Sequence, residues 1–274
     1  MARRLWGLPA YYVGLLALLY LPLVVLLVFA FNDGTILAFP MRGFTLRWFR
    51  ELFATEALMR ALRNSVAVAL GAATVAVILG ACGAIAFVRF RFRGKGAFMT
   101  VALLPLYVPF VVVGVALLLL FSAIGLPRSL LTIAAAHTVV SFPYALLIVT
   151  ARLVGFDAHL EEAAVSLGAN YWQTLRRVIL PLIAPALLAA WLVAFTVSFD
   201  EFAIANLLAG AEPTLPVYLY SQLRMSARLP LVIAMAGLVM VITLSIFFTL
   251  VSLRRYVFRV PAPAPTPAPA AQVA

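Results

Sequence analysis

The chain has 274 residues, of which 66% are hydrophobic and 11% charged, and its mean hydropathy is +1.13. Soluble domains contain roughly 45–50% apolar residues, so this composition excludes a soluble globular protein and indicates a protein of the lipid bilayer. The net charge of +11 does not indicate nucleic-acid binding, because the basic residues lie in brief clusters at the ends of apolar runs. The single cysteine, Cys82, provides neither a disulfide nor a cysteine-based metal site.

Six apolar runs are each long enough for a transmembrane helix, which needs about 20 mostly apolar residues. Backbone donors and acceptors must be paired inside hydrocarbon, and the runs lack the alternating pattern of barrel strands. We therefore expect an all-α membrane protein. The predicted spans are Tyr11–Phe31, Ser65–Val88, Phe98–Phe121, Leu130–Ala151, Ile183–Ala205 and Leu229–Leu253.

Basic residues predict the orientation of the spans. With both termini cytoplasmic, 12 of the 20 lysines and arginines lie on the inner side, including four in the cluster Arg89–Lys95, which is hard to translocate. Residues 1–10 then form a cytoplasmic N-terminus and residues 11–260 the transmembrane permease domain. Residues 261–274 are a tract of proline and alanine, which predicts a disordered tail.

The first outer loop, residues 32–64, contains a segment in which aromatic and aliphatic residues recur at helical spacing between charges. The segment begins at Thr45 and ends at Leu62. This pattern predicts one amphipathic helix that lies at the outer membrane interface.

The inner segment, residues 152–182, predicts two short helices joined by a tight turn. Asp157 can cap the first helix, and Glu161 and Glu162 lie near its positive end. Gly168 can end this helix in the left-handed conformation, which costs glycine little. The segment therefore predicts a compact elbow that could dock on a partner.

The second short helix of this elbow begins at Asn170, and Gln173 three residues later completes the Asx version of a capping box. Pro181 and Pro185 then open the fifth span. The alternative to a docking elbow is an amphipathic connector that packs against its own bundle.

The elbow resembles the EAA motif of binding-protein-dependent ABC importer permeases, although Val178 stands where isoleucine is usual. This resemblance implies the type I ABC importer permease fold, with six transmembrane helices and the elbow seated in a groove on a cytoplasmic ATPase. Small alanines permit close approach, and Glu162 offers a carboxylate to a partner arginine. The ATPase-coupling residues that follow from the resemblance are Glu161, Glu162, Ala163, Ala164, Gly168, Leu180 and Pro181.

The likeness extends over roughly Arg63 to Leu253. It includes RNSVAVAL from Arg63, RFRFRGK from Arg89, ARLVGFD from Ala151, FTVSFDEF from Phe195 and TLPVYLYSQLR from Thr214. These segments resemble the polyamine branch of the family, closest to C-type spermidine/putrescine permease subunits. It implies a heterodimer with a homologous second permease, two cytoplasmic ATPase subunits, a periplasmic or extracellular solute-binding protein and a lipid environment in the bacterial cytoplasmic (inner) membrane. No Walker A sequence is present. We therefore expect this chain to be non-catalytic and a separate subunit to hydrolyse ATP. We expect no cofactor, no metal and no nucleic-acid partner.

The acids near the end of the fifth span are candidates for a substrate pathway. Asp200 lies 15 residues beyond Pro185, or about 22 Å along a helix, and Glu201 follows it. Thr196 shares the face of Asp200, and Phe199 adds an aromatic ring. Carboxylates and rings suit an organic polycation. The alternative is a structural acid at the interface or paired with an arginine such as Arg224.

A histidine and three helix-breaking prolines within the predicted spans each allow two interpretations. His137 could relay protons, or it could hydrogen-bond within the bundle. Pro105, Pro109 and Pro143 could be hinges or tolerated kinks.

The rival functions are import of another small solute within the same family and ion-coupled secondary transport, in which His137, Asp200 and Glu201 would be coupling residues. No internal repeat is evident, which disfavours the secondary transporter. An intramembrane enzyme lacks support, because no serine–histidine pair or metal-ligand cluster stands out.

Overall fold

A computed structural model describes the backbone of residues 7–34, 39–155, 159–225 and 228–257. In these ranges the chain is helical apart from short connections and an isolated β-bridge between Asn32 and Phe44. The all-α fold is therefore confirmed for this part of the chain. The chain divides into two compact units, one formed by Met1–Glu51 with Ser226–Ala274 and the other by Leu52–Met225.

The first unit contains α1 (Gly7–Phe29) and α12 (Leu229–Val257), which pack against each other. Gly237 of α12 permits this approach, because a Cβ there would lie 3.4 Å from the Leu27 side chain. After α1 the chain folds back, and the Trp48 indole donates a hydrogen bond of 2.8 Å to the Asn32 carbonyl oxygen. This contact ties the first turn of α2 (Arg47–Ala54) to the residues that follow α1.

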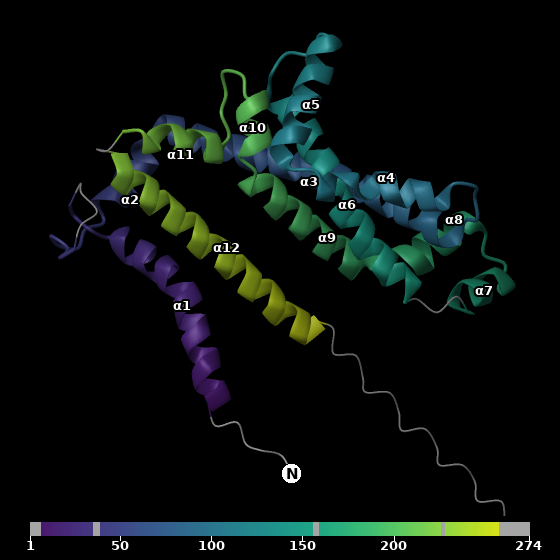
Figure 1. Cartoon of the computed structure of the whole chain (residues 1–274). Helices are drawn as coiled ribbons and strands as arrows, with labels where there is room; N and C mark the ends of the chain where they lie inside the picture. Colours follow the sequence, from purple (N-terminus) through teal and green to yellow (C-terminus); the bar gives the residue numbers. More distant parts are fainter. Residues whose placement is uncertain (1–6, 35–38, 156–158, 226–227, 258–274) are drawn as a thin grey trace, which may run out of the picture. The chain divides into compact units, whose positions relative to one another are not determined.

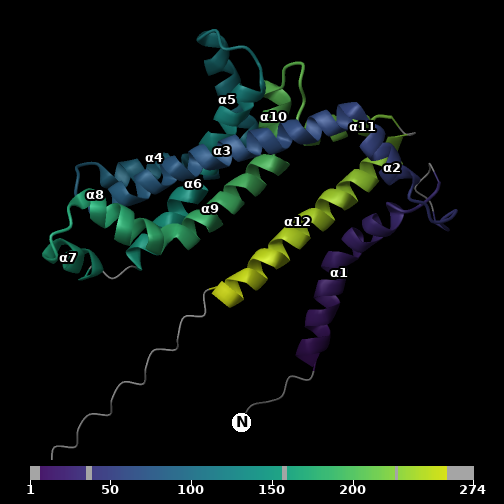
Figure 2. The same ribbon diagram turned by 180° about the vertical axis from the view of Figure 1, so that it is seen from behind.

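The second unit is built on three helices that pack side by side, α3 (Glu56–Arg89), α6 (Leu130–Val154) and α9 (Leu180–Asp200), as Figures 1 and 2 show. Small residues let the helices approach closely, as is typical of membrane helices, for which burial alone gives little driving force. At Gly80 of α3, a Cβ would lie only 2.6 Å from the Ala145 Cβ of α6.

Within the described residues, four helical segments are long and apolar enough to cross a bilayer: α1, α3, α6 and Tyr171–Asp200. The helices α4 (Lys95–Tyr107) and α5 (Phe110–Ala123) together form a further, bent candidate span. Residues Leu229–Ser245 of α12 form a shorter apolar helix. The protein is therefore a multi-pass membrane protein.

The third predicted span, Phe98–Phe121, is wrong as a single helix. The chain bends by 108° between α4 and α5 (Figure 1). Val108 is extended, with φ −90° and ψ 131°, because the ring of the following Pro109 disfavours the helical conformation in the residue before it. Beyond the bend, Gly114 of α5 packs against α10 (Ala203–Leu208), where a Cβ would lie 3.3 Å from Ile204 Cα.

Other predicted boundaries also differ. The single amphipathic helix predicted from Thr45 is wrong, because Thr55 is extended and separates α2 from α3. The fifth span ends at Asp200 rather than Ala205, because Glu201 is extended and α10 begins anew. Asp157, residues 1–6 and the tail 261–274 lie outside the described residues.

Candidate functional site

The elbow consists of α7 (His159–Ser166) and α8 (Tyr171–Thr174). Gly168 has a φ of +85°, which confirms the predicted left-handed residue at the end of α7. The amide of Gly168 donates to the Val165 carbonyl at 2.9 Å, and the amide of Ala169 donates to the Ala164 carbonyl at 3.0 Å. These bonds satisfy carbonyl groups that the end of a helix leaves unpaired.

The predicted capping box of α8 is also confirmed. Asn170 Oδ1 accepts from the Gln173 amide at 2.9 Å, and Gln173 Oε1 accepts from the Asn170 amide at 2.9 Å. The prediction that α8 is separate from the fifth span is wrong, because the chain continues through a π-helical turn, Leu175–Ile179, into α9. Pro181 explains the wide turn, since proline has no amide hydrogen and its ring crowds the carbonyl four residues earlier.

The two adjacent glutamates of the elbow lie in different surroundings. Glu161 Oε1 lies 2.5 Å from Arg89 Nη2 at the end of α3, and both side chains are largely buried, with 23% and 19% exposed. The Glu162 side chain is 72% exposed and lies 3.2 Å from His159 Nδ1 on the same helix. Glu161 therefore faces its own unit, and Glu162 faces outward.

The exposed surface of the elbow is largely apolar. Leu167 is 89% exposed, and Leu160, Val165 and Trp172 are also exposed. Ala163, Gly168 and Pro181 are exposed, whereas Ala164 and Leu180 are half-buried. An exposed apolar patch beside an exposed carboxylate is typical of a surface that binds another protein.

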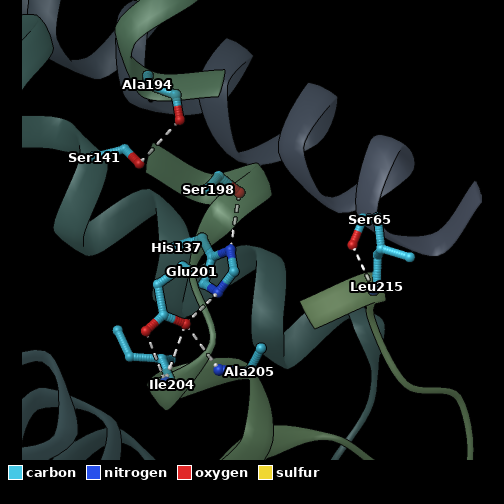
Figure 3. A network of polar contacts seen from close by, with 9 residues as sticks. All are labelled: Ser65, His137, Ser141, Ala194, Ser198, Glu201, Ile204, Ala205 and Leu215. Atoms are coloured by element: carbon cyan, nitrogen blue, oxygen red, sulfur yellow. Dashed lines mark hydrogen bonds and ion pairs between the residues drawn. The ribbon is translucent and has the colours of Figure 1, made fainter. Parts of the chain in front are cut away.

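A buried polar network fixes the junction between α9 and α10 (Figure 3). The Glu201 carboxylate accepts hydrogen bonds from the amides of Ile204, at 2.9 and 3.0 Å, and Ala205, at 3.0 Å. It also lies 3.2 Å from Nε2 of His137 on α6, whose Nδ1 lies 2.8 Å from Ser198 Oγ. Glu201 therefore caps α10 and links it to α6.

Asp200, the neighbouring acid, is exposed at the end of α9. Thr196 is exposed on the same flank, and its hydroxyl donates to the Leu192 carbonyl at 2.8 Å. Phe199 is half-buried. Among the described residues no ion pair joins Asp200 to Arg224, whose guanidinium carbon lies 6.0 Å from the centre of the Tyr220 ring. Asp200 and Thr196 are therefore both exposed near the end of α9, whereas Glu201 is buried.

Phe199 is the last ring of an aromatic ladder along α9. The Phe195 and Phe199 rings stack at 5.7 Å between centroids, and the Trp191 and Phe195 rings at 5.4 Å. The Trp191 indole donates to Thr74 Oγ1 of α3 at 3.1 Å, which fixes the far end of the ladder.

Two contacts of the site were not predicted from the sequence. One is the pairing of Arg89 with Glu161, and the other is that of His137 with Glu201. The only local signal for the second is that Ser198 and Glu201, which both contact His137, lie three positions apart in the sequence. Within the described residues no group of three or more histidine, cysteine or acidic side chains could hold a metal ion.

Solved structures show the same fold. A chain of a bacterial ABC transporter involved in the import of the acidic polysaccharide alginate matches with a TM-score of 0.72 and 20% identity, covering 92% of this chain and 94% of that chain. A chain of an amino acid ABC transporter matches with a TM-score of 0.60 and 21% identity, covering 77% of this chain and 99% of that chain.

Relatives match in sequence over most of their length. The Escherichia coli (strain K12) putrescine transport system permease protein PotI is 38% identical over 81% of both chains. The Haemophilus influenzae spermidine/putrescine transport system permease protein PotC is 35% identical over 84% of this chain and 89% of its own. The family model for binding-protein-dependent transport system inner membrane components matches residues 72–258. The chain therefore belongs to the family of binding-protein-dependent transport system inner membrane components.

Proposed function

We propose that this chain is the membrane-spanning permease subunit of an ATP-driven polyamine importer. The observation that carries the proposal is the likeness to putrescine and spermidine/putrescine permeases, which reaches 38% identity over 81% of the chain. The chain does not hydrolyse ATP. Energy for uptake therefore comes from a separate ATPase subunit.

The proposed topology has six spans in the bacterial inner membrane, with both termini in the cytoplasm. The bent pair α4–α5 is the third span, and α12, whose 29 residues are long enough to cross the hydrocarbon core, is the sixth. The elbow then lies on the cytoplasmic side, together with the basic cluster at Arg89–Lys95.

The proposed assembly contains a homologous second permease as heterodimer partner, two cytoplasmic ATPase subunits and a solute-binding protein outside the membrane. The exposed apolar surface of α7 and α8, with Glu162 beside it, supports the elbow as the ATPase-binding surface. A solved alginate transporter in complex with its alginate-pentasaccharide-bound periplasmic protein has the same fold, at a TM-score of 0.70, and supports the solute-binding protein.

Asp200 is the proposed contact for the cationic substrate. Its carboxylate is exposed at the end of α9, and Thr196 and Phe199 precede it by four positions and one position. A carboxylate, a hydroxyl and an aromatic ring suit an alkylammonium group. Glu201 acts differently, because its oxygens already accept two backbone amides and face His137. We therefore assign Glu201 to holding the junction that presents Asp200.

Replacing Asp200 with asparagine tests this assignment. Asp200→Asn keeps the size of the side chain and removes its charge, and a lost charge-assisted contact of about 1.5–3 kcal/mol lowers polyamine uptake by roughly tenfold or more. The matched control is Asp33→Asn, an exposed acid in the loop after α1, which should leave uptake near wild type. Unchanged polyamine uptake by an Asp200→Asn variant that assembles normally would remove Asp200 from the pathway.

The identity of the substrate can be tested by competition. A second candidate within the family is another solute, since a probable molybdenum ABC transporter permease of Haloferax volcanii is 35% identical over 67% of this chain. Labelled putrescine uptake by the complete importer should be inhibited by excess spermidine and not by molybdate. Inhibition by molybdate, or absence of putrescine uptake by an importer that hydrolyses ATP, would contradict the polyamine assignment.

A further inference from the structure

The contact between Arg89 and Glu161 joins the elbow to the longest helix of its unit. Arg89 is the last residue of α3, and Glu161 lies in the first turn of α7. Their side chains meet at 2.5 Å and are about four-fifths buried. A charge pair with this limited exposure is screened much less than a surface pair, so it can hold two elements in a defined position.

A second contact joins the other elbow helix to the same place. The ring of Phe90, directly after Arg89, meets the ring of Tyr171, the first residue of α8, edge to face at 6.3 Å between centroids. Both elbow helices therefore rest on the end of α3. A displacement of the elbow cannot occur without moving this end or breaking both contacts.

The helix α3 reaches the opposite end of the unit. Its 34 residues give a length of about 50 Å at 1.5 Å per residue. Near its first turns, Ser65 Oγ accepts a hydrogen bond of 2.7 Å from the backbone amide of Leu215, the first residue of α11 (Leu215–Leu223). Nδ2 of the Asn64 side chain donates to the Pro213 carbonyl at 3.1 Å. α3 therefore has polar contacts with the elbow at one end and with α11 at the other.

We propose that Arg89 and Glu161 form the joint through which movement of the elbow reaches α3, and that Glu161 is a positioning residue while Glu162 contacts the ATPase. The inference rests on the proposed function of the elbow. It changes one assignment from the sequence motif, in which both glutamates belonged to the ATPase-binding surface. The different exposure of their side chains, 23% and 72%, carries the distinction.

Charge exchange tests the joint in the complete importer reconstituted in proteoliposomes, with putrescine uptake and ATP hydrolysis measured together. Arg89→Glu and Glu161→Arg should each lower the putrescine imported per ATP hydrolysed about tenfold, the size of coupling expected between residues in contact. The double variant, which restores opposite charges, should recover most of the wild-type ratio. Arg91→Glu, a charge reversal at an exposed arginine two residues beyond the end of α3, is the matched control and should remain near wild type.

The amount of ATPase that co-purifies separates positioning from binding. Glu161→Gln should keep wild-type ATPase association and lower the uptake-to-hydrolysis ratio, whereas Glu162→Gln should weaken association. The proposal is overturned if the double variant is no better than the single ones, or if Glu161→Gln loses association as Glu162→Gln does. A wild-type assembly without ATP-dependent uptake would instead refute the proposed function.

Discussion

At the scale of single residues, Asp200 and Glu201 show how position rather than residue type separates two adjacent carboxylates. Asp200 is exposed at the end of α9, whereas Glu201 is 6% exposed and accepts backbone amides from α10. The extended backbone at Glu201 turns its side chain toward His137. Because the helix breaks between these two residues, Asp200 lies on the exposed surface and Glu201 in the interior.

Removing His137 tests the structural role of this network. His137→Leu should destabilise the protein by about 3 kcal/mol, because it leaves the buried Glu201 carboxylate without a side-chain partner. Thermal unfolding in detergent measures the loss. Ser141→Ala on the same helix is the control and should cost less than about 1 kcal/mol, since its hydroxyl lies 3.5 Å from the Ala194 carbonyl. Equal stability of the two variants would contradict the network.

At the scale of helices, the close packing of α3 against α6 depends on a glycine, Gly80, which has no side chain. A Cβ at Gly80 would lie 2.6 Å from the Ala145 Cβ and 2.9 Å from the Leu146 backbone nitrogen. Neither atom can move without shifting α6. This contact sets the distance between two of the three helices that form the unit.

Gly80→Ala should therefore destabilise the protein by about 1–3 kcal/mol, despite the higher helix propensity of alanine. Gly71→Ala on the same helix is the matched control, because nothing lies within 4 Å of its Cβ position, and it should be neutral or slightly stabilising. Unfolding in detergent compares the two variants. A stabilised Gly80→Ala would show that the two helices do not approach this closely.

The turn of the elbow depends on backbone conformation alone. Gly168 has a φ of +85° and open space around its Cβ position, so only the conformational preference of a substitute matters. Gly168→Val should reduce ATPase association, because a β-branched residue resists the left-handed conformation, and Gly168→Asn should retain it. Co-purification of the ATPase with each variant measures this difference. Equal association of both variants would mean that the turn does not shape the binding surface.

Features that depend on near neighbours in the sequence were predictable. The left-handed Gly168 and the capping box of Asn170 and Gln173 follow from residues within a few positions of one another. The 108° bend before Pro109 was a local feature too, but proline is tolerated inside membrane helices, as Pro143 of α6 shows. Sequence alone could not decide which of these prolines breaks its helix.

Features that join distant residues were not predictable in the same way. Arg89 and Glu161 are separated by 72 positions, and His137 and Glu201 by 64. Their meeting depends on how α3, α6, α7 and α9 pack. The sequence drew attention to each of the four residues separately, but the packing of the helices determines which charges meet.

At the scale of the whole molecule, the surface proposed to bind the ATPase and the acid proposed to contact the substrate lie at opposite ends of the continuous helical segment Tyr171–Asp200. The elbow offers an apolar surface and Glu162, and Asp200 lies at the end of α9, the helix into which α8 continues. α3 and α9 thus run between the elbow and the junctions at α10 and α11. An importer driven from one side needs such continuous elements.

The most direct test of this account is putrescine uptake into proteoliposomes, measured with and without the ATPase subunits. The chain with its partner permease and binding protein should show no accumulation until the ATPase and ATP are both present. Accumulation driven by a proton or sodium gradient in the absence of the ATPase would contradict it, and would make this chain an ion-coupled transporter.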